Sequence, residues 1–256
     1  TCPAPVEGLA CGDYAINTIQ PTYQPYTPGT ADAQKLPPQT TPTIGDRLSA
    51  GKVSWAWYSG GWSNANGEVG RPGWTNGNGP TCSDSNAFST AIYPNCPDNL
   101  FQFHHQPFNY YANYAPGTEA RKNHLRDEQE FINLTKSSNR ECKLKGVSFI
   151  KPIGAENEHP GYASESTGSN HLVELIDGIK NSACAKDTMI IVTYDEFGGQ
   201  WDHVPPPGQG NQNDPYDQWG PGTRIPALII SPFLKNEFVV DHNSHDTTSI
   251  IATIEH

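Results

Sequence analysis

The residues best suited to chemistry are two adjacent carboxylates that follow an apolar segment. Asp195 and Glu196 come directly after residues 188–194, which read as a continuous apolar strand of the kind found in the middle of a parallel sheet. Two neighbouring carboxylates at the end of a buried strand are costly unless a cation neutralises them. Hard divalent ions take such oxygen ligands. We therefore expect one divalent metal ion here, Ca²⁺ or Mg²⁺ rather than Zn²⁺, with a solvated acidic turn as the alternative.

Histidines supply the second group of candidates. His159 lies in the loop after a predicted strand, and His104 and His105 stand between aromatic residues. Paired histidines among aromatics suggest a partly buried polar site, although one core and one exposed histidine would give the same pattern. A lone loop histidine such as His159 is usually a surface residue, and His242 beside Asp241 is a weaker candidate still. Four further histidines are read as ordinary helical or terminal residues: His124, His171, His245 and His256.

Acidic metal ligands and several imidazoles on one sheet edge suit the transfer of an anionic group such as phosphate. A cation and imidazoles can stabilise charge on the transferring oxygens, and an imidazole can protonate the leaving alkoxide. The net charge of -11 opposes anionic substrates at long range, so local positive charge must matter. The sequence has no GxxxxGK[ST] motif, which argues against a nucleotide triphosphatase.

The elements that must position these residues alternate between strand and helix. Strands are predicted at 53–58, 147–152, 188–194 and 225–233, and helices at 45–51, 119–136, 170–181 and from Asp246 onwards. Residues 1–45 should be extended, and 59–100 should form a long loop excursion. This order predicts an α/β fold with a mainly parallel sheet sandwiched between helices. Functional residues then collect at the carboxyl edge of the sheet.

The six cysteines point to a compartment. None forms a CxxC pair, so a zinc knuckle or thioredoxin-type site is not expected. Three disulfides are the favoured reading and six free thiols the alternative; the pairs would be Cys2–Cys11, Cys82–Cys96 and Cys142–Cys184. Disulfides indicate an oxidising location, either the periplasm or outside the cell.

Composition argues against nucleic-acid binding and against a membrane-spanning segment. Lys and Arg total 16 against 27 Asp and Glu, and no basic stretch is present, so nucleic-acid binding is not expected. No apolar run of about 18 residues is present, so no membrane span is expected. No internal repeat or domain boundary divides residues 1–256, which we expect to form a single domain. Thr1 is not an initiator methionine and the last predicted helix stops without a capping signal, so we expect a chain cut at both ends.

At this point the residues resemble a known family. The string from Val192 to Pro206, VTYDEFGGQWDHVPP, closely resembles the signature of the bacterial phosphoesterase family. That family contains acid phosphatases and phosphatidylcholine-type phospholipases C, within the alkaline phosphatase superfamily. Four further segments look like its acid-phosphatase branch, and the resemblance runs over nearly the whole chain: 36–46, 53–58, 104–108 and 241–249.

The resemblance implies an alkaline-phosphatase-like fold and a metal-dependent phosphomonoesterase that acts through a covalent phosphoenzyme. Asp195 and Glu196 match the paired acidic metal ligands of the family. His105, with His104 beside it, matches a histidine that contacts the phosphoryl group. His159 matches another phosphate-contacting histidine and is the preferred acid for the leaving group. Three further residues match positions that support this machinery: Asp202, His203 and His242.

Two of the family's features are missing from this chain. The resemblance implies a Glu-Asn pair of metal ligands and a Ser or Thr nucleophile after two glycines, and the segment Gly60–Trp62 is not that motif. We therefore expect a C-terminal part of a longer enzyme, inactive alone, with the N-terminal part as a partner. An acid phosphatase acting on a phosphate ester is the first hypothesis. The alternatives are a phospholipase C, in which the aromatic segment 55–62 could line a lipid groove or simply pack in the core, and a non-catalytic secreted fragment.

Overall fold

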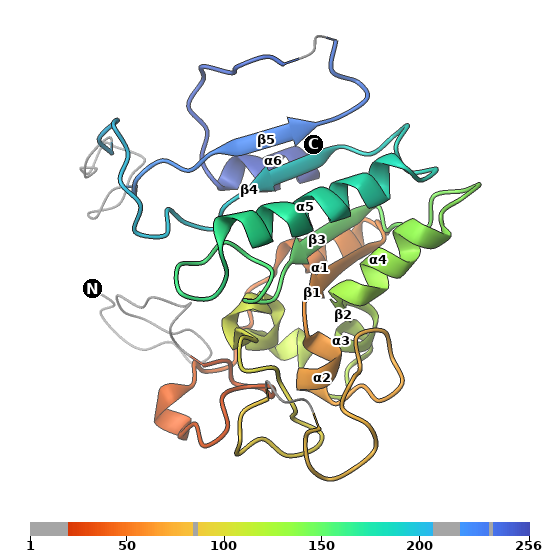
Figure 1. Ribbon diagram of the computed structural model, residues 1–256, viewed down its shortest axis with the longest axis vertical. Helices are drawn as coiled ribbons and strands as arrows, with labels where there is room; N and C mark the ends of the chain where they lie inside the picture. Colours follow the sequence, from red (N-terminus) through yellow and green to blue (C-terminus); the bar gives the residue numbers. More distant parts are fainter. Residues whose placement is uncertain (1–19, 84–86, 207–220, 236–237) are drawn as a thin grey trace.

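Three parallel strands form the central sheet of the computed structural model, which describes residues 20–83, 87–206, 221–235 and 238–256 (Figure 1). β1 (Trp55–Ser59) lies between β2 (Leu125–Asp127) and β3 (Val147–Lys151), and pairs in parallel with both. β1 is buried along nearly its whole length, as its apolar sequence predicts for a strand covered on two faces. The predicted α/β class, with a parallel sheet flanked by helices, is confirmed.

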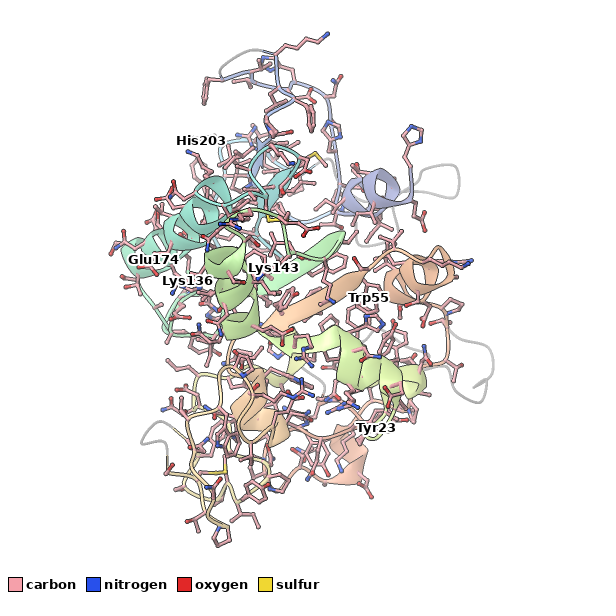
Figure 2. All side chains as sticks on the ribbon, turned by 90° about the vertical axis from the view of Figure 1, so that its right-hand side faces the viewer. Tyr23, Trp55, Lys136, Lys143, Glu174 and His203 are labelled. Carbon is pink, nitrogen blue, oxygen red and sulfur yellow. A yellow bond between two sulfur atoms is a disulfide. The ribbon has the colours of Figure 1, made fainter. Side chains whose placement is uncertain are left out.

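Helices cover the two faces of this sheet. On one face, α4 (Glu128–Ser137) and α5 (Glu165–Lys180) pack on Ala56 and Tyr58 of β1. On the other face, Trp55 packs against α1 (Ile44–Ala50) and the segment 103–114. Figure 2 shows α4 and α5 on one side of the sheet and α1 on the other. Alternate side chains of β1 therefore serve two separate cores.

The remaining elements are short. The helices are α2 (Trp62–Asn66), α3 (Glu119–His124) and α6 (Thr248–Glu255). The 3-10 turns are η2 (Asp32–Gln34), η3 (Phe103–His105), η4 (Pro107–Tyr110) and η5 (Ala112–Tyr114). No helix in the described ranges is long and apolar enough to cross a membrane.

The single helix expected over 119–136 is wrong. α3 ends at His124, the chain then forms β2, and α4 begins at Glu128. Leu125 is fully buried and pairs with Trp57 of β1, so the sheet takes residues that helical spacing would have placed in a helix. The Asp127 side chain accepts a hydrogen bond from the backbone N of Gln129 at 2.9 Å, which caps the new helix.

The expectation that residues 188–194 lie in the middle of the parallel sheet is also wrong. β4 (Ile190–Thr193) pairs antiparallel with β5 (Ala227–Ile230), and among the described residues these two strands form a separate sheet. Leu228 and Ile229 point to opposite faces of β5 and are 51% and 50% exposed. The sequence predicted this strand correctly but not its place in the fold. The residues of β4 are apolar enough for a strand buried on both faces, so their composition suggested a central position.

Two of the expected disulfides are confirmed. Cys82 bonds to Cys96 within the long excursion, and Cys142 bonds to Cys184, which joins the loop before β3 to the chain after α5. The Cys2–Cys11 pair lies outside the described residues. Smaller differences concern helix ends: α5 begins five residues before the expected start at Asn170, and α6 begins two residues after Asp246, whose carboxylate accepts a hydrogen bond from the backbone N of Thr248 at 2.9 Å.

Candidate active site

The paired histidines are held beside the middle strand of the parallel sheet. The 3-10 turn η3 carries both, and Trp57 of β1 donates a hydrogen bond from Nε1 to the backbone oxygen of His105 at 2.9 Å. The two imidazole rings lie 4.6 Å apart, nearly perpendicular to one another. His105 is only 8% exposed. The aromatic residues around the pair are therefore core residues that fix its position.

A lysine and an aspartate join the ends of two strands. Lys151 is the last residue of β3, and Asp195 lies two residues beyond the end of β4. Lys151 Nζ donates a hydrogen bond to Asp195 Oδ2 at 2.8 Å. This ion pair links the parallel sheet to the β4–β5 sheet at the edge where functional residues of α/β folds collect.

The histidines and this ion pair share one electrostatic environment. The pKa of His105 is lowered to about 3, mainly by burial and also by the charges of Lys151 and His104, while Asp195 opposes the shift. Burial also lowers the pKa of His104, with Lys151 and His159 adding to the shift. Both imidazoles are thus neutral near pH 7. A neutral imidazole can donate one hydrogen bond and accept another.

His105 also has an unmet hydrogen-bonding requirement. Its Nδ1 atom is buried and has no hydrogen-bond partner among the described residues. Buried polar atoms are nearly always paired, so such an atom in a native structure calls for an explanation. A further group that belongs at this site would supply one.

His159 is exposed on a loop, and contacts with residues on either side of it in the sequence hold it in place. Its backbone N donates a hydrogen bond to Asn157 Oδ1 at 2.9 Å, and its ring stacks on Tyr162 with 4.2 Å between ring centres. The hydroxyl of Tyr194, just after β4, donates to the carboxylate of Glu158. The loop after β3 and the loop after β4 are therefore held together, and His159 acts electrostatically on both paired histidines.

The two acidic residues differ in their surroundings. Partial burial acts to raise the pKa of Asp195, but the hydrogen bond and charge of Lys151 outweigh it and lower the pKa below 3.8. The Glu196 carboxylate turns back onto its own loop and accepts a hydrogen bond from the backbone N of Gly198 at 2.7 Å. Their oxygens suit a hard divalent cation. In the described parts of the chain, however, no third ligand joins them, so these residues alone do not complete a metal site.

The three expected supporting residues lie apart from the histidine pair in the contacts of the described residues. Asp202 Oδ2 accepts a hydrogen bond from Arg224 Nε at 2.7 Å. His203 packs edge-on against Trp201 with 4.4 Å between ring centres, on a loop at the outside of the molecule (Figure 2). His242 is exposed. The structure thus brings together His104, His105, His159 and Asp195, and their chemical roles remain predictions.

Lys151 is the residue of this cluster that sequence reasoning missed. It stands at the end of a strand that was predicted correctly, so the rule that selected Asp195 could have selected it. A second group, formed by Glu128, Glu156 and His171, was also missed: His171 was read as an ordinary helical residue, and its two glutamate neighbours come from other elements.

Comparison with known proteins identifies the family. The chain is 28% identical to non-specific phospholipase C6 of Arabidopsis thaliana over 137 residues, covering 44% of this chain and 26% of that protein. It is 30% identical over 118 residues to non-specific phospholipase C1 of the same plant, covering 40% and 22%. It is 31% identical over 139 residues to phospholipase C B of Mycobacterium tuberculosis, covering 45% and 25%.

The chain thus spans about a quarter of the length of these curated relatives. The model of the Phosphoesterase family matches residues 18–256, which is nearly the whole chain. The chain therefore belongs to the phosphoesterase family.

Proposed function

We propose that this chain carries part of the active site of a metal-dependent phosphoric ester hydrolase, an acid phosphatase that acts on phosphomonoesters. The observation that carries the proposal is the convergence of His104, His105, His159 and the Lys151–Asp195 pair where β3 and β4 end. The chain belongs to a family of phosphoesterases, and this cluster suits phosphoryl transfer. A phosphoryl group needs hydrogen-bond donors and positive charge around its oxygens.

The residues then divide the work. His105 and His104, both neutral, donate hydrogen bonds to phosphoryl oxygens. His159 is exposed, so it can exchange protons with solvent and protonate the leaving alkoxide. Asp195 and Glu196 are the metal ligands of this chain, and a bound divalent cation would neutralise charge on the transferring group. Asp202, His203 and His242 are proposed to support this site.

We further propose that the nucleophile, and with it the phosphoenzyme step, lies in an N-terminal part of the protein outside these 256 residues. Three observations support this. Within the described residues, β3 and β4 each have one edge without a paired strand, and both faces of β5 are exposed. The buried Nδ1 of His105 has no partner there. A further strand between β3 and β4 would join the two sheets, in which case residues 1–256 form the larger part of one α/β domain.

A phospholipase C is the second candidate, because the relatives carry that name and because large apolar side chains are exposed in the segments after β4 and β5. Trp201 is 78% exposed and Phe233 is 72% exposed. The aromatic segment 55–62 does not support a lipid groove, since Trp55, Tyr58 and Trp62 are buried in the cores. The two disulfides favour an oxidising compartment, and we propose a periplasmic or secreted protein.

The test compares substrates and one matched pair of variants in the full-length protein that contains this chain. We expect hydrolysis of an aryl phosphate that EDTA abolishes, and little release of phosphocholine from phosphatidylcholine. Asp195→Asn should reduce the rate by at least about 10²-fold, whereas Asp187→Asn, on an exposed turn, should not. Preferential cleavage of phosphatidylcholine would favour the phospholipase. Full activity of Asp195→Asn would refute the assigned site, and no activity on either substrate would favour a non-catalytic protein.

A further inference from the structure

Three ligand-type side chains from three different elements meet on the α5 side of the parallel sheet, outside the site described above. Glu128 is the first residue of α4, Glu156 lies in the loop after β3, and His171 lies in α5. One carboxylate oxygen of each glutamate and one ring nitrogen of His171 all lie within 4.8 Å of one another.

The distances between these atoms match those around a single metal ion. His171 Nε2 is 3.0 Å from Glu128 Oε1 and 3.7 Å from Glu156 Oε2. Bonds of about 2.1 Å place neighbouring ligand atoms about 3.0 Å apart in an octahedron and about 3.4 Å apart in a tetrahedron. Only small movements would therefore bring all three atoms onto one cation.

The charges around the cluster are unbalanced. Glu128 is only 3% exposed, and among the described residues the ion pairs of Glu128 and Glu156 are with His171 alone. Burial raises the pKa of Glu156, and the charges of Glu128, Glu174 and Asp98 raise it further against the opposing effect of His171. Glu174 follows His171 by about one turn of α5. One imidazole thus faces several carboxylates, and buried carboxylates are costly without a cation.

We propose that Glu128, Glu156 and His171 bind a Zn²⁺ ion at a site distinct from Asp195 and Glu196. The imidazole nitrogen favours Zn²⁺ over Ca²⁺ and Mg²⁺, and carboxylate oxygens complete common zinc ligand sets. Glu156 is about half exposed, so the ion can reach the site from solvent and keep a water as its fourth ligand.

The ion would fix the loop that carries His159. Glu156 lies three residues before His159, and a zinc bridge would tie this loop to α4 and α5 at once. The same loop already packs closely on α5, because a Cβ atom at Gly168 would lie 2.8 Å from the carbonyl carbon of Asn157. The zinc site stands on its own geometry, and only its benefit to His159 rests on the proposed function.

The test is isothermal titration calorimetry of the EDTA-treated and dialysed chain with zinc chloride. We expect one equivalent of tight binding and a higher melting temperature with Zn²⁺ present. Loss of a residue that only hydrogen-bonds to a metal ligand weakens metal binding by about 10–100-fold. Glu156→Gln and His171→Gln remove ligands themselves, so each should weaken zinc binding by more than this. Glu165→Gln, on the first turn of the same helix, should bind zinc as the wild type does.

Asp195→Asn keeps the tight equivalent if the two sites are distinct, so this result separates the zinc site from the proposed catalytic metal site. Glu156→Gln decides the case if His171→Gln does not fold, because the Glu156 side chain is partly exposed and its loss should leave the core intact. Absence of tight zinc binding to the wild type, or unchanged binding to a folded Glu156→Gln variant, would overturn the proposal.

Discussion

Lys151 is the single residue whose position adds most to the site. The net charge of -11 disfavours a phosphate substrate at long range, and in the proposed site Lys151, at the end of β3, would be the local source of positive charge. Its ammonium group also holds Asp195 in place through the 2.8 Å ion pair. Both effects depend on charge, so a side chain of similar length without charge should lose both.

Lys151→Met in the full-length protein should therefore lower kcat/KM for an aryl phosphate by about 10²-fold, the usual cost of one group that stabilises the transferring oxygens. Lys143→Met is the matched control, because Lys143 lies in the loop before β3, whereas Lys151 is the last residue of that strand. Equal kinetics for the wild type and Lys151→Met would show that this lysine does not contribute to catalysis.

Single candidates could be predicted when they follow an apolar strand directly. Asp195 was selected in this way, and His159 was selected because its loop follows the strand predicted at 147–152; their roles stay predictions. The zinc ligands could not be found, because Glu128, Glu156 and His171 are spread over 44 residues and meet only through the packing of α4 and α5 on one sheet face. The spacing of residues along the sequence does not predict contacts that form only when distant elements pack together.

At the scale of elements, α1 depends on the hydrogen bonds of one carboxylate. Asp46 accepts hydrogen bonds from the backbone N and the hydroxyl of Thr43, both at 2.7 Å, and from the hydroxyl of Tyr114 at 3.1 Å. Partial burial acts to raise the pKa of Asp46, but these hydrogen bonds outweigh it and the pKa lies below 3.8. A carboxyl group with a lowered pKa stabilises the fold above its unfolded-state pKa, and this contribution is lost as the pH falls through the folded-state pKa.

Asp46→Asn should lower the free energy of unfolding by about 1 kcal/mol at pH 7, as the loss of a helix cap does. The difference from the wild type should shrink as the pH is lowered from 5 through the folded-state pKa, because the wild-type carboxyl then becomes neutral as well. Urea denaturation at several pH values measures it, and a difference that stays constant from pH 7 to pH 2 would contradict the explanation.

Gly168 allows α5 to pack closely against a neighbouring loop. Gly168 faces the loop that carries His159, and a Cβ atom there would lie 2.5 Å from Glu158 Cγ and 2.8 Å from the carbonyl of Asn157. Gly168→Ala should destabilise the protein by about 1–3 kcal/mol through overpacking, although alanine normally stabilises a helix interior. Ser169→Ala, an exposed neighbour in the same helix, is the control in thermal denaturation. A stabilising Gly168→Ala would mean that the loop can move away from α5.

The elements themselves were largely predictable. The apolar runs at 53–58 and 147–152 became β1 and β3 with nearly the expected bounds, because a strand covered on both faces has a distinctive composition. The expected helix over 119–136 failed for a non-local reason, namely the pairing of Leu125 with Trp57. The expected central position of β4 failed because strand composition does not specify which strands pair.

At the scale of the whole molecule, two sheets stand side by side (Figure 1). The Lys151–Asp195 ion pair joins them where β3 and β4 end. β5 exposes apolar residues on both faces, and the chain spans about a quarter of its curated relatives. These features agree with our proposal that this chain holds only part of a phosphoesterase active site.

The most direct test of that proposal is the intact mass of the natively purified protein under denaturing and reducing conditions, with an aryl-phosphate assay on the same sample. We expect a polypeptide well above 28.0 kDa, or a second fragment that copurifies, together with hydrolysis that EDTA abolishes. A single 28.0 kDa species that hydrolyses the substrate would contradict the incomplete site, and a single inactive 28.0 kDa species would contradict the assignment of an enzyme.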